Sequence, residues 1–241
     1  MSKSSPFEAV HKVLGANFAE YDGWKLPADY GDKSAEAEAL AQGCAAFDLS
    51  SFGRIIIKGI HSEALMDRLL DGGADKCCEG KWIWSGLSEK SVSEAVILRV
   101  GKTGADFVIF TLPAQRKTVL ISAQSLIDKT GPADVEISDI TDNTAMLGIY
   151  GPEAVKRAES FLPFDIAAIS PGCIEKVSLF MISATIIRGG WAGADGVEIV
   201  CPASVAQMAG QVVAKYHKKA NITPAGMDCL KAVIANGRFN Q

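Results

Sequence analysis

Apolar residues recur at intervals of three to four along several stretches of the chain, the spacing that places them on one face of a helix. This pattern predicts five helices, which start at or near Ser34, Ser62, Arg116, Pro152 and Pro202. Ser34 is expected to cap the first helix, and Gly131-Pro132 is expected to stop the third after Lys129. The buried face of the fifth helix is predicted to consist of Val205, Met208, Ala209, Val212, Val213 and Tyr216.

Segments with strand-like composition lie between these helices. They cover residues 54–58, 94–100, 106–111, 135–140, 146–150, 177–187 and 197–201. The turn sequence Gly101-Lys-Thr-Gly104 predicts a hairpin between the second and third strands. Because these strands adjoin through a short turn and helices stand between groups of strands, the pattern predicts an α+β fold of antiparallel sheets with flanking helices.

Composition places the chain among globular proteins, since 48% of its 241 residues are apolar and 22% are charged. A net charge of −4 argues against a protein that binds nucleic acid by neutralising phosphates. The first residues, Met1 to Phe7, lack the apolar stretch of a signal peptide, and the longest apolar-rich run, 177–187, is too short to span a bilayer. We therefore expect a cytoplasmic protein with neither a nucleic-acid nor a membrane partner.

The cysteines and histidines do not form a known metal motif. None of the six cysteines has C-x-x-C spacing, and His11, His61 and His217 lie far apart in the sequence. We interpret the adjacent Cys77 and Cys78 as reduced loop residues rather than as a soft-metal or redox pair. The chain also lacks the phosphate-loop, serine-hydrolase-elbow and H-E-x-x-H signatures. The sequence therefore predicts no metal site.

One segment combines glycines, an aromatic side chain and two acids directly before a strand. It reads Arg188-Gly-Gly-Trp-Ala-Gly-Ala-Asp-Gly-Val-Glu-Ile199. Such a loop lets backbone approach a planar ligand, and the Glu198 carboxylate is able to accept two parallel hydrogen bonds from an amidine-like edge, such as the 2-amino and N3–H groups of a pterin. A glycine-rich turn with a surface glutamate is the alternative that these residues leave open.

The end of this segment, Gly190 to Ile199, resembles the G-Y-T-G-E-D-G-x-E-I motif of the T-protein (aminomethyltransferase) family of the glycine cleavage system. Two earlier stretches resemble motifs of the same family. Tyr21-Asp-Gly-Trp-Lys-Leu-Pro-Ala-Asp-Tyr30 is similar to F-A-G-W-x-M-P-x-x-Y, and Ala46-Phe-Asp-Leu-Ser-Ser-Phe52 is similar to the segment around F-D-V-S-H-M. With Gly151-Pro152 included, the likeness runs from about Phe7 to Pro224, nearly the whole chain.

The resemblance implies one T-protein-like folate-binding region over residues 1–241, with room for two interleaved subdomains, and it implies that the family's C-terminal β-barrel domain is absent. In the family, tetrahydrofolate sits in a central cavity, and the carboxylate of the D-G-x-E motif holds its pterin. Carried over, the resemblance implies a folate pocket lined by Glu198, Trp191, Phe52, Trp82, Phe107 and Ile109. For Phe107 and Ile109, a place among core strand residues is an equal alternative.

The family's catalytic motif is altered in this chain. G-G-x-x-D-D reads Lys90-Ser-Val-Ser-Glu-Ala95, so Glu94 replaces the first aspartate and Ala95 replaces the second, which handles the proton in the family. A register slip of one residue makes Glu94 the candidate catalytic residue. The family's C-terminal motif is also eroded over residues 224–237, where both arginines are lost and a gap recovers only Lys231.

Two functions follow as competing hypotheses. The first is a tetrahydrofolate-dependent one-carbon transferase, either an aminomethyl- or a methyltransferase, whose partners are reduced folate and a protein that carries the one-carbon donor. The second is a folate-binding subunit or regulator without chemistry of its own that acts in a larger complex. A structural remnant that binds nothing is a third, favoured if Glu198 proves to be engaged in a salt bridge.

Overall fold

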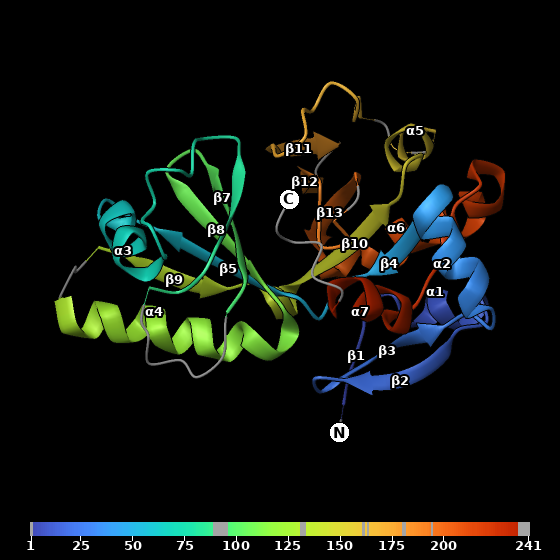
Figure 1. Cartoon of the computed structure of the whole chain (residues 1–241), viewed down its shortest axis with the longest axis horizontal. Helices are drawn as coiled ribbons and strands as arrows, with labels where there is room; N and C mark the ends of the chain where they lie inside the picture. The colour runs from blue at the N-terminus through green and yellow to red at the C-terminus, as the bar shows by residue number, and fades with distance from the viewer. Residues whose placement is uncertain are drawn as a thin grey trace. The chain divides into compact units, whose positions relative to one another are not determined.

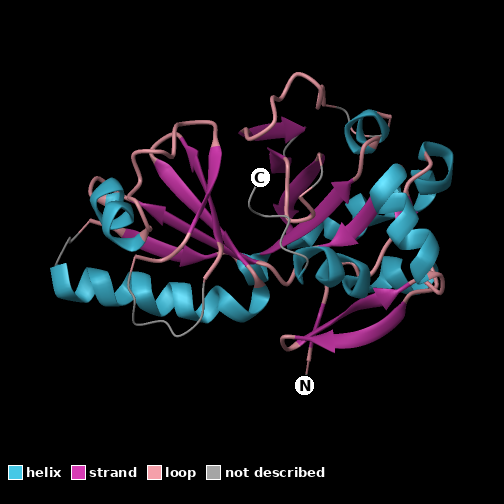
Figure 2. Cartoon of the chain, in the orientation of Figure 1, coloured by secondary structure: helices cyan, strands magenta, loops and turns pink. Residues whose placement is uncertain are grey.

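The computed structural model describes residues 2–88, 96–130, 134–160, 162, 164–179, 182–193 and 195–235. The chain folds into two compact units. Unit 1 consists of Met1–Ser50 and Asn143–Gln241, and unit 2 consists of the intervening Ser51–Asp142. Each unit combines strands with helices, as the colouring of Figure 2 shows.

Unit 1 is built on a six-stranded sheet in the order β11-β12-β13-β10-β4-β14. Its strands are β4 (Ala45–Asp48), β10 (Thr144–Tyr150), β11 (Ile174–Leu179), β12 (Ile182–Arg188), β13 (Gly196–Pro202) and β14 (Thr223–Pro224). The neighbouring pairs are antiparallel except for the short β4–β14 pair. A smaller sheet in the order β1-β3-β2 joins β1 (Lys3–Ser4), β3 (Trp24–Asp29) and β2 (Asn17–Tyr21).

Helices cover one face of the six-stranded sheet. The helices of unit 1 are α1 (Glu8–Val13), α2 (Lys33–Gln42), α5 (Ala154–Glu159), α6 (Ala203–Ala220) and α7 (Met227–Ala235). Ile149 and Val197 of the sheet pack with Ala154 of α5 in one buried cluster. Side chains alternate between the two faces along a strand. Tyr150, which follows Ile149, and Glu198, which follows Val197, therefore point to the opposite face of the sheet.

Unit 2 is a five-stranded antiparallel sheet in the order β6-β7-β8-β5-β9. Its strands are β5 (Gly53–Lys58), β6 (Trp82–Ser85), β7 (Leu98–Thr103), β8 (Asp106–Thr111) and β9 (Glu136–Asp139). Helices α3 (Ser62–Leu69) and α4 (Arg116–Thr130) cover one face of this sheet (Figure 1). Leu65 of α3 and Val119 of α4 meet Ile55 of β5 in the core there.

The predicted α+β class with antiparallel sheets is confirmed, and several elements agree with their predicted bounds. Helices α3 and α4 start where the apolar period places them. The predicted β7–β8 hairpin is also present, but its turn is Gly104-Ala105, where Gly104 has a φ of +64°. The start of α2 was predicted wrongly, since Asp32 rather than Ser34 caps it by accepting a hydrogen bond from the amide of Ala35. The single strand predicted over 177–187 is divided between β11 and β12, which pair with each other.

The predicted buried face of α6 is wrong for its largest residues, whereas Val205 packs against a buried cluster as predicted. Met208, Val212 and Tyr216 are 55%, 38% and 37% exposed, and the buried residues of α6 are small ones, Ala206, Gly210 and Ala220. A Cβ on Gly210 would lie 2.9 Å from side-chain carbons of both Phe7 and Val10, so the helix is packed close through its smallest residues. Among the described helices, none is long and apolar enough to cross a membrane.

Candidate functional site

The carboxylate of Glu198 lies within the six-stranded sheet of unit 1. Glu198 is on β13, in register with Gly148 of β10 on one side and Ile187 of β12 on the other. Its side chain is completely buried. The sequence left open that this residue is a surface glutamate, and the structure excludes that alternative. A carboxylate removed from water needs hydrogen-bond donors close by.

Two donors from the protein reach one oxygen of this carboxylate. The Tyr150 hydroxyl donates to Oε1 over 2.5 Å, and the backbone N–H of Trp191 donates to the same oxygen over 3.3 Å. Both donor residues are themselves fully buried. The structure therefore brings together two of the predicted site residues, Trp191 and Glu198, and the contact is made by the amide of Trp191.

The loop that carries Trp191 is held at its base by Arg188. The Nη2 atom of Arg188 donates to both carboxylate oxygens of Asp195, at 3.1 and 3.0 Å, and its Nη1 donates to the carbonyls of Ile166 and Ile169. The loop also needs a left-handed residue, which Gly189 supplies with a φ of +93°. These contacts fix the segment whose amide reaches Glu198.

Tyr150 is a site residue that the sequence analysis missed. Its ring lies 5.8 Å from that of Phe47, centroid to centroid, on the same face of the sheet as Glu198. Tyr150 and Glu198 are 48 positions apart, and only the register between β10 and β13 makes them neighbours. The sequence did offer a local signal for Tyr150 as a site residue. It stands directly before Gly151-Pro152, in a strand that also contains Gly148.

Phe107 and Ile109, two further predicted pocket residues, lie in the core of unit 2. Both are buried in the cluster formed with Ile55, Leu98 and the helices α3 and α4. This is the packing of core strand residues, the alternative that the sequence left open for them. The residues at even positions of β8 point to the opposite face of the sheet.

Trp82 belongs to that opposite face. Its ring meets Trp84 edge to face at 5.5 Å, and the Arg99 guanidinium carbon lies 5.1 Å from the Trp82 ring and 4.9 Å from the Phe110 ring. Arg99 and Phe110 are register partners in β7 and β8, which explains why the cation has an aromatic ring on two sides. The predicted Trp82 thus forms part of an aromatic cluster around a buried arginine.

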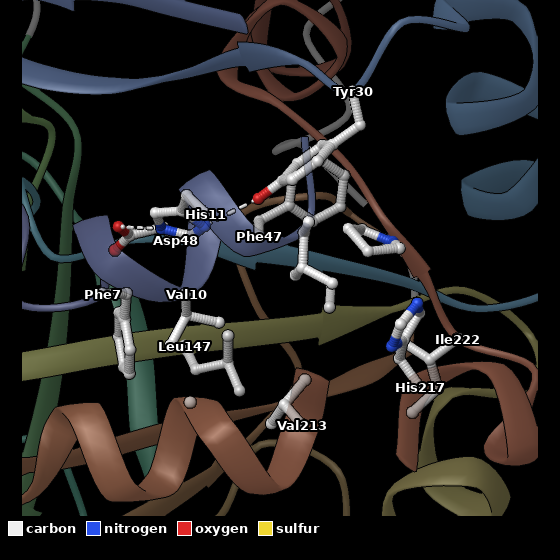
Figure 3. A pocket seen from close by; sticks show the side chains of 14 residues that line it. Phe7, Val10, His11, Tyr30, Phe47, Asp48, Leu147, Val213, His217 and Ile222 are labelled. Atoms are coloured by element: carbon white, nitrogen blue, oxygen red, sulfur yellow. Dashed lines mark hydrogen bonds and ion pairs between the residues drawn. The ribbon is translucent and has the colours of Figure 1, made fainter. Parts of the chain in front are cut away.

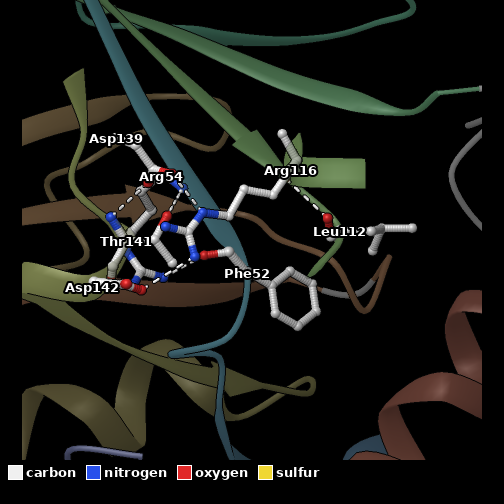
Figure 4. A network of polar contacts seen from close by, with 8 residues as sticks. Phe52, Arg54, Leu112, Arg116, Asp139, Thr141 and Asp142 are labelled. Carbon is white, nitrogen blue, oxygen red and sulfur yellow. Dashed lines mark hydrogen bonds and ion pairs between the residues drawn. The ribbon is translucent and has the colours of Figure 1, made fainter. Parts of the chain in front are cut away.

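Phe52 lies beside a second buried arginine. The carbonyl of Phe52 accepts a hydrogen bond of 2.7 Å from Nη1 of Arg54, whose Nη2 donates to the carbonyl of Thr141, and the Phe52 ring points away from these groups (Figure 4). Arg116 forms an ion pair of 2.6 Å with Asp139 in the same network. Phe52 itself is 1% exposed. The buried Arg54 guanidinium thus donates to backbone carbonyl oxygens, so its role is structural.

A cavity of unit 1 lies beside a third polar cluster (Figure 3). His11 contacts Tyr30 through Nδ1 at 2.7 Å and Asp48 through Nε2 at 2.9 Å, and Ser5 also donates to Asp48. The volume of about 30 Å³ suits a single water molecule and is far below the roughly 300–1,000 Å³ of small-molecule sites. This cavity is therefore too small for a pterin.

The remaining sequence predictions are not tested by the structure. Glu94 and Ala95 lie outside the described residues. Phe52 and Trp82 belong to unit 2 whereas Trp191 and Glu198 belong to unit 1, so their convergence on one pocket stays a prediction. Within the described residues, no three His, Cys, Asp or Glu side chains are grouped so as to hold a metal ion.

Residues 7–239 match the family model of the GCVT N-terminal domain. The chain belongs to this family. One relative is the aminomethyltransferase of Geobacillus kaustophilus (strain HTA426). It is 25% identical to this chain over 231 residues, which cover 94% of this chain and 62% of the relative. The chain therefore spans less than two thirds of that relative's length.

Solved structures show the same fold for this GCVT domain. The glycine cleavage system aminomethyltransferase T from Bartonella henselae matches with a TM-score of 0.84 at 17% identity, over 97% of this chain and 62% of that chain. Heterotetrameric sarcosine oxidase from Corynebacterium sp. U-96 contains a chain that matches with a TM-score of 0.58 at 14% identity. That match covers 90% of this chain and 95% of the sarcosine oxidase chain.

Proposed function

We propose that this chain is a tetrahydrofolate-binding, aminomethyltransferase-like protein that transfers a one-carbon unit to reduced folate. The observation that supports this most directly is the buried carboxylate of Glu198, held by Tyr150 and Trp191 in a domain of the GCVT family. A buried, acceptor-only group suits the N–H donors of a flat, uncharged heterocycle better than it suits an anion.

The residues present fit such a ligand by the chemistry of their donors and acceptors. A carboxylate offers about four lone-pair positions, and Tyr150 and Trp191 both donate to Oε1. Glu198 would hold the pterin edge, and Trp191 of the same unit is the proposed apolar contact of its rings. Bound tetrahydrofolate would supply the nucleophilic nitrogen that accepts the one-carbon unit.

Proton handling falls to residues 94 and 95 in this proposal. Ala95 carries no ionisable group, and Glu94 is the proposed catalytic residue. A well-placed general acid or base contributes about 10²–10⁴ in rate. A donor that is already activated, such as a methylated corrinoid or a sulfonium, needs less of this help. A separate protein that carries the one-carbon donor is the proposed partner.

Calorimetric titration with tetrahydrofolate tests the binding part of the proposal. Glu198→Ala is expected to weaken binding by more than about tenfold, because charge-assisted hydrogen bonds to the ligand are lost. Glu175→Ala, which removes an exposed glutamate from β11, is the matched control and should bind as the wild type does. Binding by Glu198→Ala within about threefold of the wild type would contradict the proposal.

A non-catalytic subunit or regulator is the second candidate function. It is favoured by one observation, the match to nearly the full length of a chain in heterotetrameric sarcosine oxidase, which is an assembly of several chains. The same GCVT-like fold therefore occurs at about this length within a larger complex. Reduced folate and a partner subunit are the partners that this candidate predicts.

An activity assay tests whether an aminomethylated lipoyl carrier is the one-carbon donor. The chain is supplied with tetrahydrofolate and an aminomethylated lipoyl carrier, and the release of methylene-tetrahydrofolate is followed. We expect no turnover at an ordinary enzymatic rate, because Ala95 stands where the family's aspartate handles the proton. Ordinary turnover that Glu94→Gln abolishes would instead establish Glu94 as the catalytic acid.

A further inference from the structure

We propose that the exposed side of α6, together with the end of α1, is a docking surface for an acidic amphipathic helix of a partner protein. The surface is defined by Val13 of α1 and by the solvent-facing side of α6 from Gln207 to Lys219. It lies entirely within unit 1. The inference goes beyond the proposed function, because none of these residues belongs to the proposed folate site.

A groove between α1 and α6 forms the centre of this surface. Its volume is about 440 Å³, and its lining includes Ala9 and Val13 of α1 and Gln207, Gln211 and Lys215 of α6. This volume is in the range of small-molecule sites, but such sites enclose most of their ligand. Val13, Gln211 and Lys215 are exposed, so the groove covers only one side of its occupant. It therefore suits apolar side chains that project from a larger partner.

A row of apolar side chains runs beside the groove. Met208, Val212 and Tyr216 follow one another at intervals of four residues, which places them on one side of α6. They are 55%, 38% and 37% exposed, and Val13 at the groove is 82% exposed. Among the described residues, these are four of the six large apolar side chains that are exposed. Apolar side chains gathered on one exposed face mark a contact surface for another macromolecule.

The charge of the surface defines the chemistry of the partner. Helix α6 contains Lys215, Lys218 and Lys219 near its C-terminal end and has no acidic residue. In the described part of the chain, no carboxylate forms an ion pair with these three lysines. Glu8, the one acidic residue of α1, already pairs with two other lysines. The helix dipole accounts for positive charge at this end of α6, but it does not account for the apolar row beside it.

An acidic helix fits this surface better than the other occupants do. A second copy of the chain offers no acidic residue of α6 to meet the lysines, as a self-complementary contact requires. A membrane surface does not fill a groove, and the net charge of −4 opposes approach to anionic lipids. A partner helix places its apolar side in the groove and along the row, and its carboxylates then meet the lysines.

Fluorescence anisotropy with a labelled peptide tests this inference on the full chain. The probe is a helical peptide of 18 residues, as long as α6, with leucines along one side and glutamates flanking them. We expect the wild type to bind it with a Kd below about 100 μM, and to bind a peptide with lysines in place of the glutamates at least about tenfold more weakly. Binding of the acidic peptide should weaken as the salt concentration rises.

Met208→Asp and Lys215→Glu test whether the peptide binds at this surface. Each should weaken binding of the acidic peptide by about tenfold or more. Ile121→Asp and Lys117→Glu are the matched controls, since they make corresponding changes on the exposed side of α4 in unit 2, where Ile121 is 59% exposed. Both controls should bind within about threefold of the wild type. Circular dichroism checks the fold of every variant, and if Met208→Asp unfolds, Lys215→Glu decides.

The other results overturn the inference. These are no binding of the acidic peptide, equal binding of the lysine peptide, and equal losses in the α4 controls. Dimerisation in sedimentation velocity that Met208→Asp abolishes would assign the surface to a second copy, and binding to phosphatidylserine vesicles that Lys215→Glu abolishes would assign it to a membrane. Met208→Asp should bind tetrahydrofolate as the wild type does, so the docking surface and the proposed folate site are tested independently.

Discussion

Arg188 and Asp195 form an ion pair across the base of the loop between β12 and β13, with Nη2 at 3.0–3.1 Å from both carboxylate oxygens. The Arg188 side chain is 7% exposed, and its Nη1 also donates to the carbonyls of Ile166 and Ile169. One guanidinium therefore holds both the loop that presents Trp191 to Glu198 and the segment over residues 166–169.

Arg188→Met should lower the free energy of unfolding by about 2–4 kcal/mol, because it removes the guanidinium that donates to two carbonyls and to the Asp195 carboxylate. Urea unfolding monitored by circular dichroism measures the loss. The matched control is Arg157→Met, which removes a more exposed i,i+4 pair with Glu153 and should cost only about 0.5 kcal/mol. Equal losses in the two variants would show that Arg188 is not a structural anchor.

Gly190→Ala should be destabilising by about 1–3 kcal/mol, since the added methyl group overlaps both Tyr150 and the Glu198 carboxylate. Gly86→Ala is the control, because the Cβ atom there has its nearest neighbour at 3.5 Å and the backbone φ is not positive. Thermal unfolding of both variants provides the measurement. If Gly190→Ala were as stable as Gly86→Ala, the close packing of Tyr150 would be refuted.

Acid stability should depend on Asp48. Burial raises the pKa of its carboxyl, but hydrogen bonds from His11, Ser5 and Ser50 more than offset this and hold the pKa below the ordinary 3.8. A depressed pKa contributes stability above the unfolded-state value, and this contribution is lost as the pH falls below about 3.8 towards the folded-state value.

Asp48→Asn removes this titration. The variant should be less stable than the wild type at neutral pH by about 1–3 kcal/mol, and the difference should shrink as the pH falls below 4. Urea unfolding between pH 7 and pH 3 measures both curves. Asp75→Asn, at an exposed position, should follow the wild-type curve. Curves for Asp48→Asn and the wild type that stay parallel would contradict the role of Asp48.

Alkylation should separate the cysteines by their surroundings. Burial raises the pKa of the Cys44 thiol to about 12 and that of Cys77 to about 11, whereas the neighbouring Cys78 is exposed. Because the thiolate is the reactive form, iodoacetamide at pH 8 should modify Cys78 first and the two buried thiols only when the protein opens. Peptide mass spectrometry over time follows each site. Rapid modification of Cys77 would contradict its burial.

Features set by neighbouring residues were predictable from the sequence. The periods of α3 and α4 and the hairpin between β7 and β8 depend on residues a few positions apart, so they are visible in the chain itself. The proximity of Trp191 and Glu198 belongs to the same class, because the two lie seven positions apart at the ends of one glycine-rich loop. Short elements with little apolar period, such as α1 and β4, were missed.

Features that depend on which face of an element is covered were decided by the tertiary structure. The apolar residues of α6 cover a wider arc than the part of the helix that packs against the rest of unit 1. The small residues Ala206 and Gly210 are buried there, whereas Met208 is exposed. Phe107 and Ile109 point into the core of unit 2 because the alternation along β8 is set by the helices that cover it.

The Tyr150–Glu198 contact is the strongest case of this second kind. Each residue lies in a strand that the sequence predicted, yet the contact depends on the register of β10 against β13. A shift of one residue would turn the tyrosine to the opposite face of the sheet. The sequence by itself determined the family, the fold class and the candidate carboxylate. Only strand pairing over 48 positions decided which side chain meets that carboxylate, because register follows from the packing of whole faces and not from any local pattern.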